Sequence, residues 1–204
     1  MTNRLFLLST VASLLFAGFA AAQDTSTAEA PAETTEAPAE DAAPVVPLTK
    51  ETAEIGQGYR TTNGDWNVDC EKTVSGDDPC LMNQVLRNDE DFAIMETEVT
   101  RLASGSGSAA VLLIKTPLMT MLPEGVTLRI DGGDPARIPF FFCDSSICMA
   151  RANLRDQDVA AFKRGSKAEL RIVPVAAPDQ SVTVEMSLSG FTASYDVLPE
   201  LGAQ

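Results

Sequence analysis

The strongest constraint on the fold of this chain is the alternation of apolar and polar residues in short runs. Segments 66–70, 126–130 and 182–188 each place an apolar residue at every second position. Successive side chains of a strand point to opposite faces, so this period of two predicts half-buried strands of an antiparallel sheet. Segment 109–114 is apolar throughout and is expected to form a central strand buried on both faces.

Turns and short helices are expected between these strands. The Asp-Gly-Gly-Asp sequence at 131–134 predicts the turn of a hairpin. Residues 156–164 are typical of a helix with Asp156 as its N-cap, and Phe191 and Tyr195 stand four residues apart, which favours a second short helix. The sequence therefore predicts an all-β domain, an antiparallel β-sandwich or a jelly-roll-like fold, with one or two short helices.

The first 22 residues are typical of a secretory signal peptide. Arg4 supplies a positive charge, residues 5–19 form a short apolar run, and Ala20-Ala21-Ala22 offers a small-residue cleavage site. The run is shorter than the ~20 residues of a transmembrane helix, so an uncleaved membrane anchor is the less favoured alternative. We expect cleavage after Ala22 and an exported chain without a transmembrane segment.

A change of composition separates a linker from a folded domain. Residues 23–54 are dominated by Ala, Glu, Thr and Pro and contain no aromatic residue. Such a segment buries too little apolar surface to offset its chain entropy, so it is expected to be disordered and extended. Residues 55–204 have the usual length of one domain. Within them, the alternating Ser and Gly residues at 104–108 predict a flexible loop.

The chain has four cysteines, Cys70, Cys80, Cys143 and Cys148. Export places them in an oxidising compartment, where an even number indicates disulfides. The local pairing of 70 with 80 and of 143 with 148 is favoured, because each pair brackets turn-forming residues. Both loops are short, so each bridge is expected to stabilise by less than the usual ~2–4 kcal/mol. A four-thiolate zinc site and redox catalysis are less favoured alternatives.

Several catalytic chemistries are excluded by composition. The chain contains no histidine, which removes Ser-His-Asp triads, Cys-His pairs and histidine-ligated metals. A carboxylate pair is the remaining enzymatic possibility, but Asp65, Asp69, Glu96 and Glu98 are not distinguished by their spacing. Residues 88–91 could hold a weakly bound calcium ion, although a turn is favoured. We therefore expect no catalytic residue, no cofactor and no metal.

The distribution of charge bears on the partner. A formal net charge of −14 argues against nucleic acid as the main ligand, since nucleic acid requires a basic footprint. The lone tryptophan, Trp66, alternates with apolar residues and is expected in the core, with a sugar-stacking platform as the alternative. Basic residues gather between 129 and 171 and form a candidate face for an acidic partner, namely Arg137, Arg151, Arg155, Lys163, Arg164 and Lys167.

The chain also resembles the invasion-associated locus B family of secreted Gram-negative proteins. The order and spacing of several short motifs carry the resemblance: Gly-Asp-Trp-Asn-Val-Asp-Cys at 64–70, Cys-Leu-Met at 80–82, Leu-Pro-Glu-Gly-Val at 122–126, Ile-Asp-Gly-Gly-Asp-Pro at 130–135 with Ile-Pro-Phe at 138–140, the Cys143/Cys148 pair, and Ser-Leu-Ser-Gly-Phe-Thr-Ala at 187–193. The resemblance implies a periplasmic or surface protein without assigned catalysis, linked in pathogenic members to host-cell entry.

These observations together favour an exported, non-catalytic protein that binds a protein or glycan of the cell envelope or of a host surface. Functional residues concentrate on loops held by a rigid scaffold, and disulfides next to turns preorganise such loops for binding. A carboxylate-dependent envelope hydrolase is the alternative.

Overall fold

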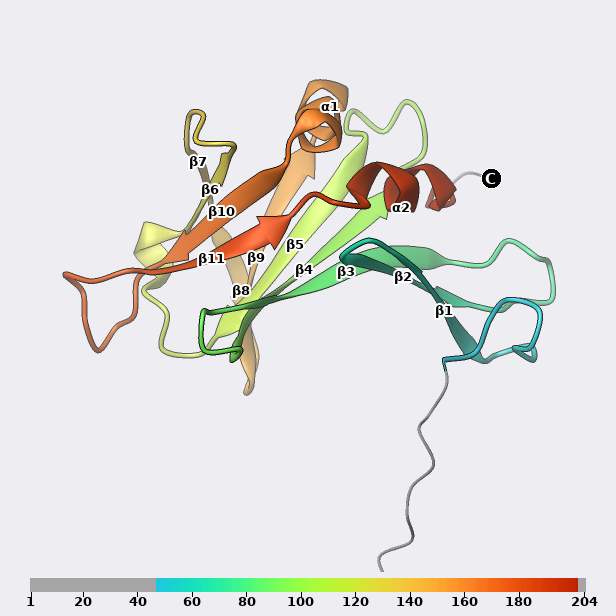
Figure 1. Ribbon diagram of the computed structural model, residues 1–204, viewed down its shortest axis with the longest axis horizontal. Coiled ribbons are helices and arrows are strands. Elements are labelled where there is room, and N and C mark those ends of the chain that lie inside the picture. The colour runs from blue at the N-terminus through green and yellow to red at the C-terminus, as the bar shows by residue number, and fades with distance from the viewer. Residues whose placement is uncertain (1–46, 202–204) are drawn as a thin grey trace, which may run out of the picture. The chain divides into compact units, whose positions relative to one another are not determined.

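A computed structural model describes residues 47–201. In this range eleven strands form two antiparallel sheets packed face to face, and two short α-helices accompany them (Figure 1). The fold is therefore the all-β sandwich with short helices that the alternation of the sequence predicts. The expected signal peptide at 1–22 and the linker up to residue 46 lie outside the described residues.

The larger sheet has seven strands in the order β1-β2-β3-β4-β5-β9-β8, and the smaller has four in the order β11-β10-β6-β7. The strands of the larger sheet are β1 (Gly58–Asn63), β2 (Trp66–Glu71), β3 (Cys80–Arg87), β4 (Ala93–Arg101), β5 (Ala110–Pro117), β8 (Phe140–Cys143) and β9 (Ile147–Leu154). Those of the smaller sheet are β6 (Val126–Ile130), β7 (Ala136–Ile138), β10 (Lys167–Ile172) and β11 (Val182–Ser187), with a 3-10 helix, η1 (Leu122–Glu124), before β6.

The core lies between the two sheets. On the larger sheet Val99 lies opposite both Met82 and Leu112, and on the smaller sheet Leu128 lies opposite Leu170. All five side chains are buried in one apolar cluster. Alternate residues of each strand contribute to it, because only one face of each sheet meets the other sheet.

The expectation that segment 109–114 is buried on both faces is wrong. Its residues 110–114 belong to β5, in which they alternate between buried and half-buried. Leu112 and Ile114 face the core, whereas Val111 and Leu113 are only half-buried on the opposite face. The smaller sheet packs against one face of the larger sheet, so a continuous apolar run does not by itself indicate two covered faces.

The first helix, α1 (Asp156–Arg164), ends where predicted but begins one residue earlier, with a different cap. Asp156 is the first helical residue, and the N-cap is Arg155. The Asp158 carboxylate accepts a hydrogen bond of 2.9 Å from the Arg155 backbone N–H. Asp158, in the first turn, therefore stabilises the start of the helix from inside the helix. Its negative charge also interacts favourably with the positive end of the helix dipole.

The second helix, α2 (Phe191–Val197), places an aromatic residue at the centre of the core. The Phe191 ring makes a T-shaped contact with Trp66, with ring centroids 5.3 Å apart. It also stacks on Phe162, with the same distance of 5.3 Å between centroids. Gly190, just before the helix, has a φ of 86°, and a Cβ there would lie 1.8 Å from the Asn63 carbonyl oxygen. The β1–β2 turn and the start of α2 can approach this closely only because residue 190 is glycine.

The first described residues pack against the domain. Lys72 Nζ donates hydrogen bonds to the carbonyl oxygens of Lys50 at 2.7 Å and Ala53 at 2.8 Å, and Ala53 is buried. Their composition places these residues in the linker that was expected to run to residue 54. Main-chain carbonyl groups make these contacts, and every residue type has one, so composition gives no signal of them.

Candidate functional site

Both expected disulfides are present, and each joins two neighbouring strands. Cys70 of β2 lies opposite Cys80 of β3, and Cys143 of β8 lies opposite Cys148 of β9. The local pairing is thereby confirmed, and a zinc site made of the four thiolates is ruled out. The bridges fix the ends of two hairpins, one of which carries the loop between Cys70 and Cys80.

The basic residues of the expected binding face lie on several separate surfaces. Arg155 and Lys163 are brought together, because both line one cavity. The other four are dispersed. Arg137, opposite Thr127, and Lys167, opposite Ser187, lie on the outer face of the smaller sheet. Arg151, opposite Leu113, lies on the outer face of the larger sheet, and Arg164 is the exposed last residue of α1.

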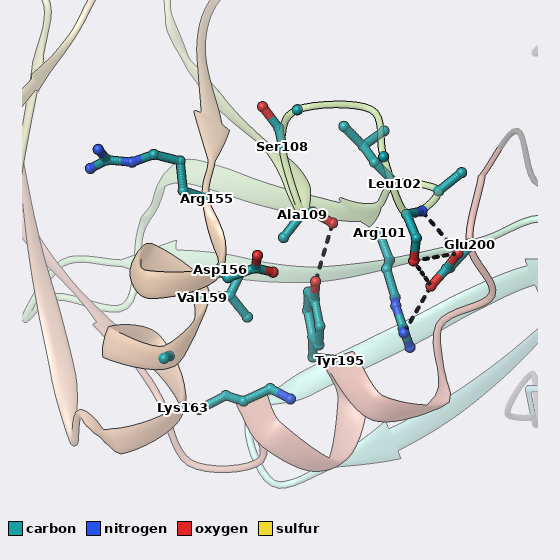
Figure 2. A pocket seen from close by; sticks show the side chains of 15 residues that line it. Arg101, Leu102, Ser108, Ala109, Arg155, Asp156, Val159, Lys163, Tyr195 and Glu200 are labelled. Carbon is teal, nitrogen blue, oxygen red and sulfur yellow. Dashed lines mark hydrogen bonds and ion pairs between the residues drawn. The ribbon is translucent and has the colours of Figure 1, made fainter.

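The cavity that Arg155 and Lys163 line has a volume of about 590 Å³ and lies between the end of β4, the loop 102–109, α1 and α2 (Figure 2). Arg101 also lines it, and we call it the cationic cavity after these three residues. The acids Asp156 and Glu200 line it as well. It is therefore a mixed-charge cavity, in which both cations and carboxylates line the wall.

Tyr195 of α2 forms part of the cavity wall. Its hydroxyl donates a hydrogen bond of 3.2 Å to the Ala109 carbonyl oxygen. Lys163 Nζ lies 4.7 Å from the centre of its ring, and the Arg101 guanidinium carbon lies 5.8 Å from it. Two cations therefore make cation–π contacts with the Tyr195 ring. Burial raises the pKa of Tyr195 above its ordinary value.

Each cation of the cavity has a carboxylate partner. Lys163 Nζ lies 2.5 Å from Asp196, and Arg155 Nε lies 2.9 Å from Asp158. Arg101 pairs with Glu200 at 3.1 Å. Partly exposed pairs of this kind contribute little to stability, but they hold flexible side chains in fixed positions around the cavity.

Glu200 is the most highly connected acid of the cavity. Its carboxylate accepts hydrogen bonds from the backbone N–H of Ser104 at 3.1 Å and from the Ser104 hydroxyl at 3.2 Å, besides the contact with Arg101 (Figure 2). The Ser104 N–H is the main reason that the pKa of Glu200 lies below its ordinary value. The Ser/Gly loop is predictable from its residues, whereas the roles of Arg101, Tyr195 and Glu200 are not, because these residues meet only in the folded chain.

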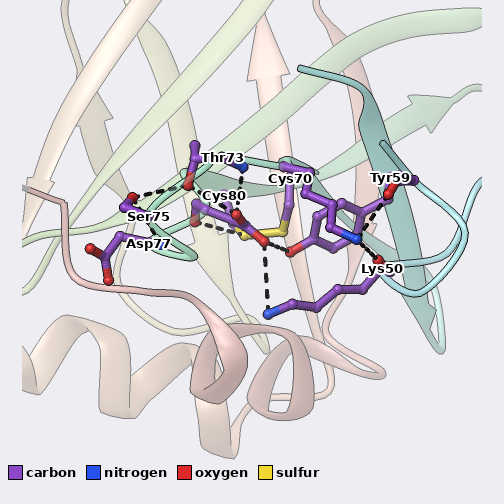
Figure 3. A network of polar contacts seen from close by, with 10 residues as sticks. Lys50, Tyr59, Cys70, Thr73, Ser75, Asp77 and Cys80 are labelled. Atoms are coloured by element: carbon purple, nitrogen blue, oxygen red, sulfur yellow. Dashed lines mark hydrogen bonds and ion pairs between the residues drawn. A yellow bond between two sulfur atoms is a disulfide. The ribbon is translucent and has the colours of Figure 1, made fainter. Parts of the chain in front are cut away.

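A second polar network lies next to the Cys70–Cys80 disulfide (Figure 3). Asp78 accepts hydrogen bonds from the Tyr59 hydroxyl at 2.9 Å and from the Thr73 N–H at 2.7 Å, and Lys50 Nζ lies 3.7 Å from it. Burial and the contact with Asp78 raise the pKa of Tyr59 to about 12. A second cavity of about 1030 Å³ adjoins this network, and Glu200 lines both cavities.

The four carboxylates considered for catalysis lie in ordinary polar contacts. Asp65 accepts a hydrogen bond of 2.6 Å from the Ser187 hydroxyl, and Glu96 and Glu98 both pair with Lys115. Asp69 is held by the Arg60 guanidinium and by the Asn83 amide. Although burial raises the pKa of Asp69, these hydrogen bonds lower it below its ordinary value overall.

The described residues 47–201 contain neither a cluster of metal ligands nor a helix that could span a membrane. Residues 88–91 form a turn between β3 and β4, in which the Asn88 side-chain oxygen accepts hydrogen bonds from the backbone of Glu90 and Phe92. No group of three or more Cys, Asp or Glu side chains in this range could hold a metal ion. Within the same residues, no helix has the length and apolar character needed to cross a bilayer.

Two packed antiparallel sheets, two cross-strand disulfides and a cavity between the helices and the Ser/Gly loop define a disulfide-stabilised β-sandwich domain. The profile of the family described as invasion associated locus B (IalB) protein matches residues 66–199. The chain belongs to this family, as its motifs predict.

A solved structure supports the fold. The crystal structure of invasion associated protein B from Bartonella henselae superposes with a TM-score of 0.56 and 21% sequence identity, and the match covers 67% of this chain and 92% of that chain. At this identity the likeness shows a shared fold. No curated protein sequence matches the chain significantly.

Proposed function

We propose that this chain is an exported, non-catalytic binding protein of the cell envelope or cell surface, and that the cationic cavity receives an anionic group of a protein or glycan partner. The observation that carries the proposal is the convergence of Arg101, at the end of β4, with Arg155 and Lys163 of the α1 segment around one cavity. In a chain of net charge −14, cations that line one cavity offer charge-assisted hydrogen bonds to an acidic ligand.

The electrostatics of the carboxyl groups favour binding over hydrolysis. A glycosidase needs one carboxylic acid whose pKa is raised. In residues 47–201 the carboxyl groups with a shifted pKa are all shifted downward, namely Glu51, Asp69, Asp78, Asp144, Asp158 and Glu200. These groups stay ionised at neutral pH and are poor proton donors.

Export and family membership support the proposed location. The signal-like sequence at 1–22 and the two disulfides suit the oxidising periplasm or cell surface of a Gram-negative bacterium. The matching family and the Bartonella henselae protein are both described as invasion associated. The partner is accordingly sought on a host surface as well as in the envelope itself.

The test compares acidic and neutral ligands on the exported chain. Arrays of oligosaccharides and peptides, with and without carboxylate or sulfate groups, are probed with the wild type and with Lys163→Gln. Acidic probes should bind, and Lys163→Gln should weaken them about tenfold, the effect of losing one charge-assisted contact. Lys167→Gln is the matched control, since Lys167 forms an exposed ion pair with Glu185 on the smaller sheet.

Two results would contradict the proposal. One is equal binding of acidic and neutral probes by wild type and both variants. The other is turnover of a glycosidase, peptidase or esterase substrate that disappears when a single carboxylate is changed to its amide.

A further inference from the structure

The segment that follows α2 pairs with the end of β4. Leu201 and Leu102 form a parallel β-bridge. The Leu201 N–H donates to the Arg101 carbonyl oxygen at 2.9 Å, and the Ala103 N–H donates to the Leu201 carbonyl oxygen at 3.2 Å. This short bridge satisfies main-chain groups that would otherwise be left where β4 ends and the Ser/Gly loop begins.

The side chain of Glu200, just before these main-chain contacts, occupies a built carboxylate site. Three donors, the Arg101 guanidinium, the Ser104 N–H and the Ser104 hydroxyl, converge on Glu200 at 3.1–3.2 Å. Charge-assisted hydrogen bonds of this kind are about twice as strong as neutral ones. All three donors come from residues 101–104, so the site is complete without the segment that fills it.

The segment also lies where the two cavities meet. Glu200 lines both the cationic cavity and the second cavity, and Pro199 and Leu201 line the second. Leu198 is buried, whereas Leu201 is 53% exposed. Few apolar contacts therefore hold the last described residues, and their attachment depends on the bridge and on the Glu200 carboxylate.

We propose that the end of β4 and residue Ser104 form a binding site for an extended peptide that carries a carboxylate, and that Pro199–Leu201 of the same chain occupies this site until a partner displaces it. The proposal rests on the proposed function, because it names the ligand class of that site. A peptide is favoured over a glycan because two of the contacts are main-chain hydrogen bonds in β register, which is how strand addition recognises a partner.

The attached segment Pro199–Leu201 competes with any free peptide for the site at Arg101 and Ser104. An attached segment acts at an effective concentration of about the millimolar range, so a free peptide binds the wild-type chain weakly. Removing the Glu200 charge weakens the resident segment and leaves Arg101 and Ser104 available. The change should therefore increase the affinity for an acidic peptide, whereas an ordinary structural role of Glu200 would give no such gain.

The experiment uses the exported chain and the probe acetyl-Leu-Pro-Glu-Leu-amide, with binding followed by NMR shifts of the Ala103 and Ser104 amides. Glu200→Gln should bind the probe about tenfold more tightly than the wild type. A probe with Gln in place of Glu should bind Glu200→Gln about tenfold more weakly than the acidic probe. Glu185→Gln, which removes an exposed acid on the smaller sheet, should leave the wild-type affinity unchanged.

A second measurement keeps the test decisive if Glu200→Gln alters the fold. In the wild type, a saturating concentration of the probe should speed hydrogen exchange at the Leu201 amide at least tenfold, because the probe releases it. Equal affinity of the acidic and Gln probes, or unchanged exchange at Leu201, would overturn the inference. Acidic array ligands that depend on Lys163 but not on Glu200 would leave the proposed function intact and remove only this assignment.

Discussion

The Tyr59 hydroxyl donates a hydrogen bond of 2.9 Å to the Asp78 carboxylate, which joins β1 to the loop closed by the Cys70–Cys80 disulfide. Both side chains are buried. The same carboxylate accepts the Thr73 N–H and lies near Lys50. One acid therefore connects the first described residues, the first strand and the first disulfide loop.

The burial of Tyr59 and its contact with Asp78 make the free energy of unfolding fall at alkaline pH. The pKa of Tyr59 is about 12 in the folded protein, against ~10 in an unfolded chain. The unfolded state loses the proton first, so the contribution is complete below pH ~10 and is lost as the pH rises toward 12. Tyr59→Phe should lower the free energy of unfolding by about 1 kcal/mol at pH 7. Urea unfolding across pH 9–12 should show this difference shrinking; a constant difference would contradict it.

The contribution of Asp78 to the free energy of unfolding should be lost at acidic pH. Hydrogen bonds from the backbone of Thr73 and from Tyr59 lower its pKa in the folded state, so its contribution is present above the unfolded value of ~3.9 and is lost as the pH falls below it. Asp78→Asn should be less stable than the wild type at pH 7, and the gap should narrow below pH ~4. Asp77→Asn, a neighbouring exposed acid, serves as the control and should follow the wild type.

The two disulfides should contribute modest and unequal stability. The chain-entropy account gives a larger effect for a longer closed loop, and the sequence separations are 10 for Cys70–Cys80 and 5 for Cys143–Cys148. Changing both cysteines of either pair to Ser should cost less than the usual ~2–4 kcal/mol, with the larger loss for the 70/80 pair. Thermal unfolding of the two double variants measures both losses. A double variant that fails to fold at 25 °C would contradict the prediction.

Trp66 is confirmed as a core residue, with its side chain fully buried. Its indole N–H donates to the Ser187 carbonyl oxygen at 2.9 Å, so the sugar-stacking alternative is wrong. Trp66→Ala should lower the free energy of unfolding by about 3–5 kcal/mol. Val197→Ala, at a side chain that is 60% exposed, should change it by less than ~0.5 kcal/mol. Native-state fluorescence that iodide quenches freely would argue against the buried position.

The approach of α2 to the β1–β2 turn should tolerate no side chain at residue 190. Gly190→Ala combines a positive φ with a Cβ contact of 1.8 Å to Asn63, and we expect a loss of at least about 3 kcal/mol. Gly76 also has a positive φ of 82°, but it has nothing within 4 Å of its Cβ position. Gly76→Ala should therefore cost only about 1 kcal/mol; equal losses for both variants would show that φ alone matters.

Local patterns in the sequence predicted much of the fold. The alternation at 66–70, 126–130 and 182–188 identified β2, β6 and β11, and α1 ends at its predicted residue. The local cysteine pairing followed from spacing. These features depend on neighbours in the chain, whose geometry is set by backbone periodicity and by turn chemistry.

The sequence by itself thus determined an all-β, disulfide-stabilised domain of the invasion associated locus B family, in which Trp66 is buried. Only the tertiary structure decided that the outer face of β5 is left partly exposed and that Arg101, Lys163 and Tyr195 share one cavity with Glu200. The physical reason is that contacts between residues far apart in the chain are fixed by how the sheets and helices pack. The pattern of a single strand or helix shows which side is buried, but not what covers it.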